Sequence, residues 1–292
     1  MESDRLKNTS AGPLNSDQAG PSTFQALPTP PVPASVTDGM MALKYRQILD
    51  LAAEKLLAFI KRRRPPIHWV SQCGQDRFVV EKIFRRKRQG FFLEIGGGDG
   101  RYLSNTLVLE TFFDWSGILV EPTDAFDSMI KNRPKANCER ATIAGSRKTV
   151  RMLEVQDNGQ VAINPDAATG NTLLSVMEDI DDAGSGFQPP SFGTIQKSYL
   201  VETITLDDLL TKWNAPSTID YFSFDVEGAE FEILQAFPFD KWKFNCIGVE
   251  RPSAELDQLL VANKYFLIRE GFPLDWFYLH RDFLDQWFET LS

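Results

Sequence analysis

Hydrophobic positions follow two different patterns along the chain. Between Met40 and Arg64 they keep the three-and-four spacing of one helix face, which predicts an amphipathic helix. The apolar positions of this face are Tyr45, Ile48, Leu49, Ala52, Leu56, Phe59 and Ile60. Lys61-Arg62-Arg63-Arg64 ends the helix, where cations favour the helix dipole, and Pro65-Pro66 prevents its continuation.

From Ile67 onward the pattern changes to short β-branched or aromatic runs separated by helical stretches. This alternation is typical of βαβ units and predicts an α/β fold with a largely parallel sheet. The expected strands are Phe91–Ile95, Gly117–Glu121, Asn137–Ile143, Asp220–Asp225, Asn245–Glu250, Tyr265–Arg269 and Trp276–His280.

Two stretches follow neither pattern. Residues 1–39 are rich in Ser, Pro, Asn, Gly and Thr, and such a segment buries too little apolar surface to offset its ordering entropy, which predicts a disordered tail. Gln156–Pro190 is rich in Asp, Gly, Asn and Pro and is too long for an ordinary connection, so we expect an insertion or lid over residues 156–199. The expected organisation is a tail (1–39), a helix (40–66) and a main domain (67–292).

The composition fits one main domain with an appendage, since the 292 residues are 42% hydrophobic and 24% charged. The net charge of -9 gives no support for nucleic acid as the general partner. The three cysteines, Cys73, Cys138 and Cys246, are far apart, so neither a disulfide framework nor a zinc site is expected. The first residues lack the apolar region typical of a signal peptide, and no stretch reaches the roughly 20 apolar residues that span a bilayer, so we expect a soluble cytoplasmic protein.

The basic end of the predicted helix has three interpretations. It is the solvated end of a helix packed on the main domain, a peripheral contact with a membrane surface, or a nuclear-import patch. The sequence does not decide among them, and it carries no signature of an oligomeric state.

Candidate chemistry begins after the first expected strand, where Gly96, Gly97, Gly98 and Gly100 follow Phe91–Ile95. Glycines let the backbone turn sharply and approach a ligand closely, and the following helix presents its amide dipole to it. We expect Ser104 to cap that helix. A nucleoside or dinucleotide fits such a turn, although similar turns also occur without a ligand.

A carboxylate ends the next expected strand. Glu121 follows the turn by a little over twenty residues, where an acid can accept hydrogen bonds from both ribose hydroxyls. Dinucleotide oxidoreductases and methyltransferases share these two features. Glu94 at the strand end and Asp99 in the turn would repel a pyrophosphate but attract the ammonium of a methionine part. These acids favour S-adenosylmethionine as the ligand.

A third group of acids follows the strand that begins at Asp220. Asp225 ends this strand, and Glu227 and Glu230 come within the next five residues. Ligands bind at this edge of an open α/β sheet, so Asp225 and Glu227 can hold the donor's ammonium, orient an acceptor hydroxyl, act as a general base or bind a divalent cation. Glu230 more simply adds negative charge at a helix N-terminus. Glu250 ends a further strand at the same crevice.

Imidazole is a frequent catalytic base, and the chain has only two histidines, His68 and His280. His280 ends the last expected strand and is interpreted as a surface residue. Neither histidine is expected to be the base, and no resident metal is expected.

Short motifs follow one another in a fixed order along the main domain. They are Ser71-Gln72-Cys73-Gly74-Gln75-Asp76, Phe92–Gly100 with Ser104-Asn105-Thr106, Gly117–Pro122, Thr205–Leu210, Ser223–Glu230 and Ile247–Glu250. With these motifs the chain resembles the FkbM family of S-adenosylmethionine-dependent methyltransferases from about Ser71 to its C-terminus. The first motif and the Asp-Val-Glu-Gly-Ala-Glu block are the most distinctive.

The resemblance implies a Rossmann-like sheet of seven strands, mostly parallel with the last strand antiparallel, and helices on both faces. It implies O-methylation of a hydroxyl acceptor with S-adenosyl-L-methionine as cofactor, and we expect Asp225 or Glu227 to be catalytic. The implied cofactor-binding residues are Gln75, Asp76, Glu94, Gly96, Gly98, Asn105, Glu121 and Asp225. Glu94 stands where the family commonly has Asp, and Gln156–Pro190 has no clear counterpart.

Two other classes of function stay open. A non-catalytic interaction protein would retain the fold while the tail and basic helix recruit partners. A nicotinamide dehydrogenase shares the turn and the acid but is disfavoured by the carboxylates around the turn. The acceptor stays open among sugar hydroxyls, polyketides, lipids and nucleic-acid caps.

Overall fold

The computed structural model describes residues 43, 46–55, 66–157, 173–179, 193–226, 228–272 and 275–289. The chain divides into two units, Met1–Pro65 and Pro66–Ser292. In the first unit, residues 46–55 are helical and exposed, in agreement with the central part of the predicted helix. The predicted tail and the basic end of that helix lie outside the described residues. Among the helices of the described ranges, none has both the length and the apolar character needed to span a membrane.

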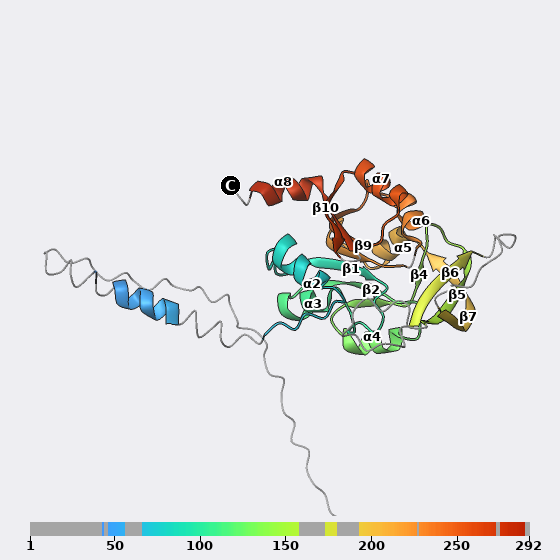
Figure 1. Ribbon diagram of the computed structural model, residues 1–292, viewed down its shortest axis with the longest axis horizontal. Coiled ribbons are helices and arrows are strands. Elements are labelled where there is room, and N and C mark those ends of the chain that lie inside the picture. Colours follow the sequence, from blue (N-terminus) through green and yellow to red (C-terminus); the bar gives the residue numbers. More distant parts are fainter. Residues whose placement is uncertain are drawn as a thin grey trace, which may run out of the picture. The chain divides into compact units, whose positions relative to one another are not determined.

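Seven strands of the second unit form one sheet with the spatial order β10-β11-β9-β8-β1-β2-β3 (Figure 1). The strands from β9 to β3 in this order are parallel, and β11 is antiparallel to both β9 and β10. The bounds are β1 (Phe91–Ile95), β2 (Ser116–Val120), β3 (Asn137–Glu139), β8 (Thr218–Phe224), β9 (Lys243–Glu250), β10 (Tyr265–Phe272) and β11 (Asp275–His280). The predicted seven-stranded, Rossmann-like sheet with an antiparallel last strand is confirmed.

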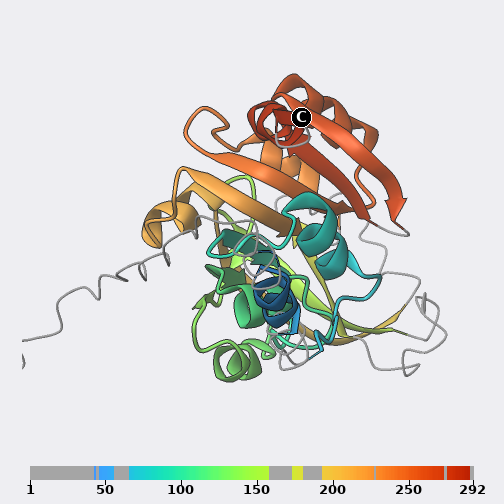
Figure 2. The same ribbon diagram turned by 90° about the vertical axis from the view of Figure 1, so that its left-hand side faces the viewer.

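Helices cover both faces of this sheet, as predicted (Figures 1 and 2). Because successive side chains of a strand point to opposite faces, Leu93 of β1 packs in the core beneath α5, α6 and α7, and Phe92 in the core beneath η1, α3 and α4. Figure 2 shows helix α4 and the C-terminal strands at opposite ends of the view. The bounds are α2 (Gln75–Phe78), the π-helix η1 (Val79–Ile83), α3 (Leu107–Phe113), α4 (Phe126–Asn132), α5 (Leu206–Lys212), α6 (Glu230–Gln235), α7 (Ala254–Ala262) and α8 (Arg281–Glu289).

A second sheet has the order β4-β7-β5-β6, with β5 antiparallel to its neighbours β6 and β7. Its strands are β4 (Thr142–Ile143), β5 (Thr149–Asp157), β6 (Leu173–Asp179) and β7 (Gly193–Ile204). The described parts of the expected insertion at 156–199 are therefore strand segments. Residues 158–172 and 180–192, which connect them, lie outside the described residues, and a lid function stays a prediction.

The prediction of one strand over Asn137–Ile143 is wrong. The chain pairs with β2 only as far as Glu139 and then joins β7 of the second sheet at Thr142. Between them, the exposed Arg140 turns outward and forms an ion pair with Asp127 of α4. The run of strand-forming residues is thus shared by two sheets, a division that local propensity does not reveal.

Candidate functional site

The parallel register places a row of residues at the carboxyl edge of the main sheet. β1, β2 and β8 end in register with one another and with the penultimate residue of β9. The residues that come next along these strands are Gly96, Glu121, Asp225 and Glu250. Asp275, the first residue of the antiparallel β11, extends the row because it pairs with Glu250. Ligands of open α/β sheets bind at this edge.

The glycine turn is closed on one side and open on another. Gly96 and Gly98 both lie in the left-handed region, with φ of 82° and 52°. A Cβ on Gly96 would lie 2.4 Å from the main-chain oxygen of Asp225, so only glycine permits this approach of the two strand ends. A Cβ on Gly98 would meet no atom within 4 Å. The free side of the turn is therefore at Gly98.

The side chain of Glu121 forms a hydrogen bond with the main chain of the turn at this open side. Its Oε2 accepts the N–H of Gly98 at 2.8 Å, and its Oε1 accepts the N–H and hydroxyl of Thr123 at 2.9 and 2.6 Å. The side chain is buried, so these bonds fix the carboxylate. The two residues that the sequence assigned to one nucleoside thus lie in direct contact.

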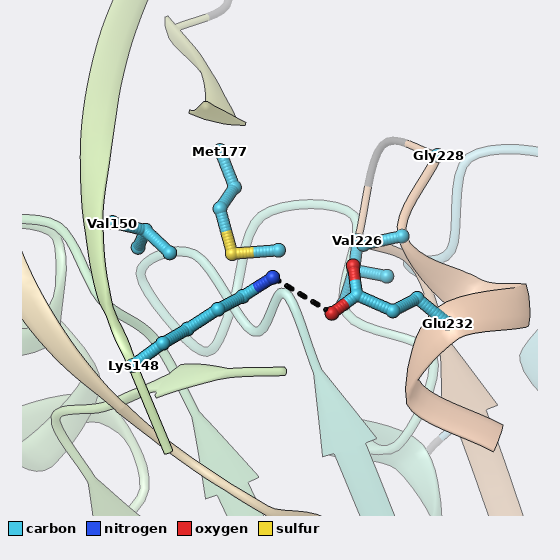
Figure 3. Close-up of a pocket in the computed structure, with 7 residues that line it drawn as sticks. Lys148, Val150, Met177, Val226, Gly228 and Glu232 are labelled. Carbon is cyan, nitrogen blue, oxygen red and sulfur yellow. Dashed lines mark hydrogen bonds and ion pairs between the residues drawn. The ribbon is translucent and has the colours of Figure 1, made fainter. Parts of the chain in front are cut away.

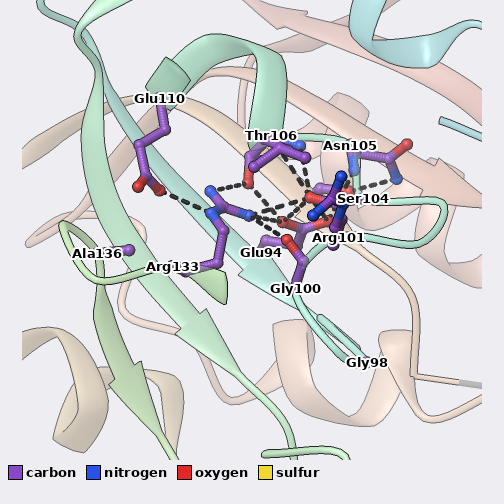
Figure 4. Close-up of polar contacts among 12 residues, drawn as sticks. Glu94, Gly98, Gly100, Arg101, Ser104, Asn105, Thr106, Glu110, Arg133 and Ala136 are labelled. Atoms are coloured by element: carbon purple, nitrogen blue, oxygen red, sulfur yellow. Dashed lines mark hydrogen bonds and ion pairs between the residues drawn. The ribbon is translucent and has the colours of Figure 1, made fainter. Parts of the chain in front are cut away.

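Glu94 is buried and faces the chain that leads into α3 (Figure 4). Its carboxylate accepts hydrogen bonds from the Ser104 hydroxyl at 3.0 Å, the Asn105 N–H at 2.8 Å and the Thr106 hydroxyl at 2.5 Å. Ser104 also accepts from the N–H of Leu107 at 3.1 Å, although α3 begins only at Leu107. Glu94 therefore anchors the start of α3 to the end of β1, and its predicted contact with the donor stays a prediction.

Arg133 is a central residue of this network that sequence reasoning missed. Its side chain is 0% exposed. It donates to Glu110 at 2.7 Å, to the main-chain oxygen of Gly100 at 3.2 Å and to Thr106 at 3.0 Å, and it lies 3.6 Å from Glu94. It joins the glycine turn to α3 (Figure 4). No local signal marks it, because its hydrogen-bond partners lie 23 to 33 residues earlier in the chain and Glu94 lies earlier still.

Asn105 carries a buried acceptor without a partner. Its amide nitrogen donates to the Ser223 hydroxyl at 2.9 Å. Its carbonyl Oδ1 is buried, and no hydrogen bond reaches it among the described residues. Buried polar atoms are nearly always paired, so this oxygen has the capacity to accept a further hydrogen bond. An ammonium suits it.

The segment Ser71–Asp76 runs beside the glycine turn, since Ser71 forms a parallel bridge with Leu103. Asp76 is fully buried and accepts from the Ser71 hydroxyl at 2.6 Å and the Val70 N–H at 2.8 Å. The carboxylate of Asp76 thus links the two ends of the segment by hydrogen bonds. Gln75 instead reaches the carboxyl edge, where its Nε2 donates to Asp275 at 2.5 Å.

Asp275 is a buried acid that sequence reasoning missed, because the last strand was expected to begin one residue later, at Trp276. Burial raises the pKa of Asp275 to about 6. The hydrogen bond from Gln75 opposes this rise, the charge of Glu250 adds to it, and Arg251 opposes it. The carboxyl edge therefore holds an acid whose pKa is raised to about 6.

Asp225 is partly buried, and the loop after it is fixed by Glu230. The Oε1 of Glu230 accepts the N–H groups of Val226 and Gly228, both at 3.2 Å. Glu230 therefore closes the loop in addition to placing negative charge at the start of α6. Glu227, the other predicted catalytic acid, lies outside the described residues.

Two titratable residues are engaged elsewhere. Asp99 accepts the N–H groups of Arg101 and Tyr102 at 2.8 and 2.7 Å, so it stabilises the turn itself. His280 ends the antiparallel β11 and so lies at the edge opposite the carboxyl row. It is buried, which lowers its pKa, and the expectation of a surface histidine is wrong.

Across the described ranges, no group of three or more His, Cys, Asp and Glu residues is placed to hold a metal ion.

The chain is similar to known methyltransferase domains. The sequence model of one family, described as methyltransferase FkbM domain, matches residues 94–270. Among solved structures, the METTL16 methyltransferase domain is 14% identical with a TM-score of 0.35, over 68% of this chain and 63% of that one. The N-terminal domain of human METTL16 in complex with SAH is 13% identical with a TM-score of 0.32, over 70% and 65%. The chain thus spans less than two thirds of either structure, and no curated protein matches it.

Proposed function

Because this chain belongs to the FkbM family of methyltransferase domains, we propose that it transfers the methyl group of S-adenosylmethionine to the hydroxyl oxygen of an acceptor. The observation that carries the choice of donor is the contact between Gly98 and Glu121. A carboxylate fixed beside the free side of a glycine turn, 2.8 Å from the Gly98 nitrogen, suits the two ribose hydroxyls of a nucleoside.

The surroundings of the turn favour this donor over a dinucleotide. Glu121 is buried beside it, and a carboxylate in a site of low dielectric disfavours a pyrophosphate. The unpartnered Oδ1 of Asn105 supplies an acceptor for the ammonium of the methionine part. Glu121 would thus hold the ribose and Asn105 the ammonium, while Gly98 leaves open space beside them.

The bound donor supplies an electrophilic methyl group on a sulfonium. The protein then has to position the acceptor oxygen in line with that methyl and remove the hydroxyl proton. Asp225 stands in the carboxyl row directly beside Gly96, so it is our candidate for the base that takes this proton. Glu230 supports it by closing the loop that follows.

Calorimetry with S-adenosylmethionine tests the donor site. We expect the full chain to bind the donor, and Glu121→Ala to weaken binding at least tenfold because the ribose loses its acceptor. Asp240→Asn, at an exposed position away from the carboxyl edge, is the matched control and should leave affinity unchanged. Absence of binding at millimolar donor would overturn the proposal.

Methyl transfer tests the chemistry. With radiolabelled donor and a panel of alcohols, Asp225→Asn should reduce kcat by about two to four orders of magnitude, the range typical of a lost general base. Donor affinity should stay within about twofold, since the Gly96 contact uses the main chain of Asp225. Donor binding without transfer to any alcohol would instead favour the non-catalytic alternative.

A further inference from the structure

Glu154 of β5 carries a buried carboxylate oxygen with spare hydrogen-bonding capacity. Its side chain is 7% exposed, and across the described ranges no hydrogen bond reaches its Oε1. The ammonium of Lys197 lies 3.6 Å from this oxygen and donates to Asp124 at 2.8 Å. Because a buried acceptor is costly to leave unpaired, Oε1 is suited to accept a hydrogen bond from a further group.

The pairing of the second sheet fixes the side on which Glu154 stands. Successive side chains of a strand point to opposite faces, so Glu154 shares a face of β5 with Val150, which is fully buried. Figure 3 shows Val150 facing the loop that carries Val226. Lys197 and Tyr199 of β7 share this face, since Lys197 pairs directly with Glu154 and Tyr199 follows it by two residues. Glu154 therefore lies on the covered face of the second sheet.

Two interactions connect this face to the loop that follows β2. Lys197 donates to Asp124, which comes after Glu121 in the same loop. The Tyr199 hydroxyl donates to the Glu154 carboxylate but not to its Oε1. Burial raises the pKa of Tyr199, this hydrogen bond raises it further, and the negative charge of Glu121 also contributes. The Glu154 carboxylate thus lies in the neighbourhood of the acid that we assign to the donor's ribose.

The order of the main sheet indicates which part of the donor would come close to Glu154. Asp225 follows β8 and Glu121 follows β2, and these two strands flank β1 on opposite sides. A nucleoside with its ribose at Glu121 and its sulfonium towards Asp225 would direct its base beyond β2, to the side where the loop contacts the second sheet. Glu154 is therefore placed for the base of the donor and not for the methyl acceptor.

We propose that Glu154 recognises the adenine of the donor, with its Oε1 accepting a hydrogen bond from the exocyclic amine. The inference rests on the proposed use of S-adenosylmethionine and names a residue that selects the base. The exocyclic amine is the hydrogen-bond donor of adenine, whereas its ring nitrogens accept. A base with an oxo group in place of the amine would set an oxygen against the carboxylate. Selection of the base would thus come from the second sheet, to which β5 belongs.

Calorimetry of the full chain with S-adenosylhomocysteine and S-inosylhomocysteine tests this selection, because the second ligand has an oxo group in place of the amine. We expect the wild type to bind the adenosyl ligand at least about tenfold more tightly, the effect of one hydrogen bond to a charged group. Glu154→Gln keeps the shape but presents an amide that can accept or donate, so the ratio should fall to about twofold or less. Glu202→Gln, on the opposite and exposed face of β7, is the control and should keep the wild-type ratio.

Equal affinities of the two ligands for the wild type, or an unchanged ratio in folded Glu154→Gln, would overturn the inference and leave the donor site in place. Circular dichroism of both variants shows whether they fold alike. The wild-type comparison needs no variant, so it decides the matter even where Glu154→Gln does not fold. Binding of neither ligand at millimolar concentration would overturn the proposed function together with this inference.

Discussion

The side-chain amide of Gln75 donates a 2.5 Å hydrogen bond to the carboxylate of Asp275, which lies 200 residues further along the chain. Both side chains are buried. Gln75 also accepts the N–H of Cys73 at 2.8 Å, so its amide spans from the segment Ser71–Asp76 to the start of β11. This bond fastens that segment to the carboxyl edge of the sheet.

The raised pKa of Asp275 predicts a pH-dependent loss of stability. Its pKa rises from 3.8 to about 6 on folding, chiefly through burial, so the folded protein binds this proton more tightly than the unfolded chain. Stability therefore falls as the pH rises through about 4 to 6 and is level above that. Between pH 4.5 and 7.5 the loss amounts to about 2 kcal/mol, at about 1.4 kcal/mol per pKa unit.

Urea unfolding of wild type and Asp275→Asn at these two pH values measures this loss. The amide does not titrate, and its Oδ1 can still accept from Gln75, so the variant should lack the 2 kcal/mol difference. Asp240→Asn serves as the exposed control and should follow wild type. Parallel pH profiles for wild type and Asp275→Asn would show that the carboxyl is not desolvated as the structure indicates.

Gly96 and Gly98 should respond differently to alanine. Gly96→Ala places a Cβ 2.4 Å from the main chain of Asp225 and should prevent stable folding. Gly98→Ala meets no protein atom, so it should cost only the roughly 1–2 kcal/mol of a left-handed backbone. Its methyl group enters the space we assign to the donor, and calorimetry should show at least tenfold weaker binding. Unchanged donor affinity in a folded Gly98→Ala protein would place the donor elsewhere.

Most strands of the seven-stranded sheet and the row of residues at its carboxyl edge follow from local patterns. The buried run Phe91–Ile95 has the bounds that the pattern predicts, because a central strand covered on both faces reads as continuous hydrophobic sequence. Glu121 and Asp225 directly follow such strands, so the parallel register alone brings them to the same edge of the sheet as Gly96.

The contacts that link distant segments could not be predicted in this way. Arg133 and Asp275 are ordinary charged residues in sequence, and only tertiary packing buries them beside Glu110 and Gln75. Strand β7 was missed because its residues are largely exposed, so the apolar alternation that marks a half-buried strand is weak. Burial of a polar residue is decided by its partners, which sequence spacing does not specify.

The loop after Asp225 should control turnover more than donor affinity. Glu230→Ala removes the acceptor of the Val226 and Gly228 N–H groups, so the loop loses its fixed path. We expect kcat to fall about tenfold while the donor's Kd stays within twofold, because the glycine turn is untouched. Glu230→Gln keeps an oxygen at the same position and should restore most of the activity. Equal losses in both variants would indicate a role for the charge instead.

Arg133 should be among the most sensitive positions of the protein. Arg133→Met leaves Glu94 and Glu110 buried without their cation, and breaking a buried pair in this way costs about 3–5 kcal/mol. Arg88→Met is the matched control: Arg88 pairs with Asp114 on the exposed surface, where such pairs contribute at most about 1 kcal/mol. Urea unfolding compares the two variants.

Because the network also fixes the turn at Gly100, donor at about one hundred times Kd should stabilise wild type by about 2.7 kcal/mol but Arg133→Met by much less. Equal stabilisation of both proteins by the donor would show that the buried network does not support the donor site.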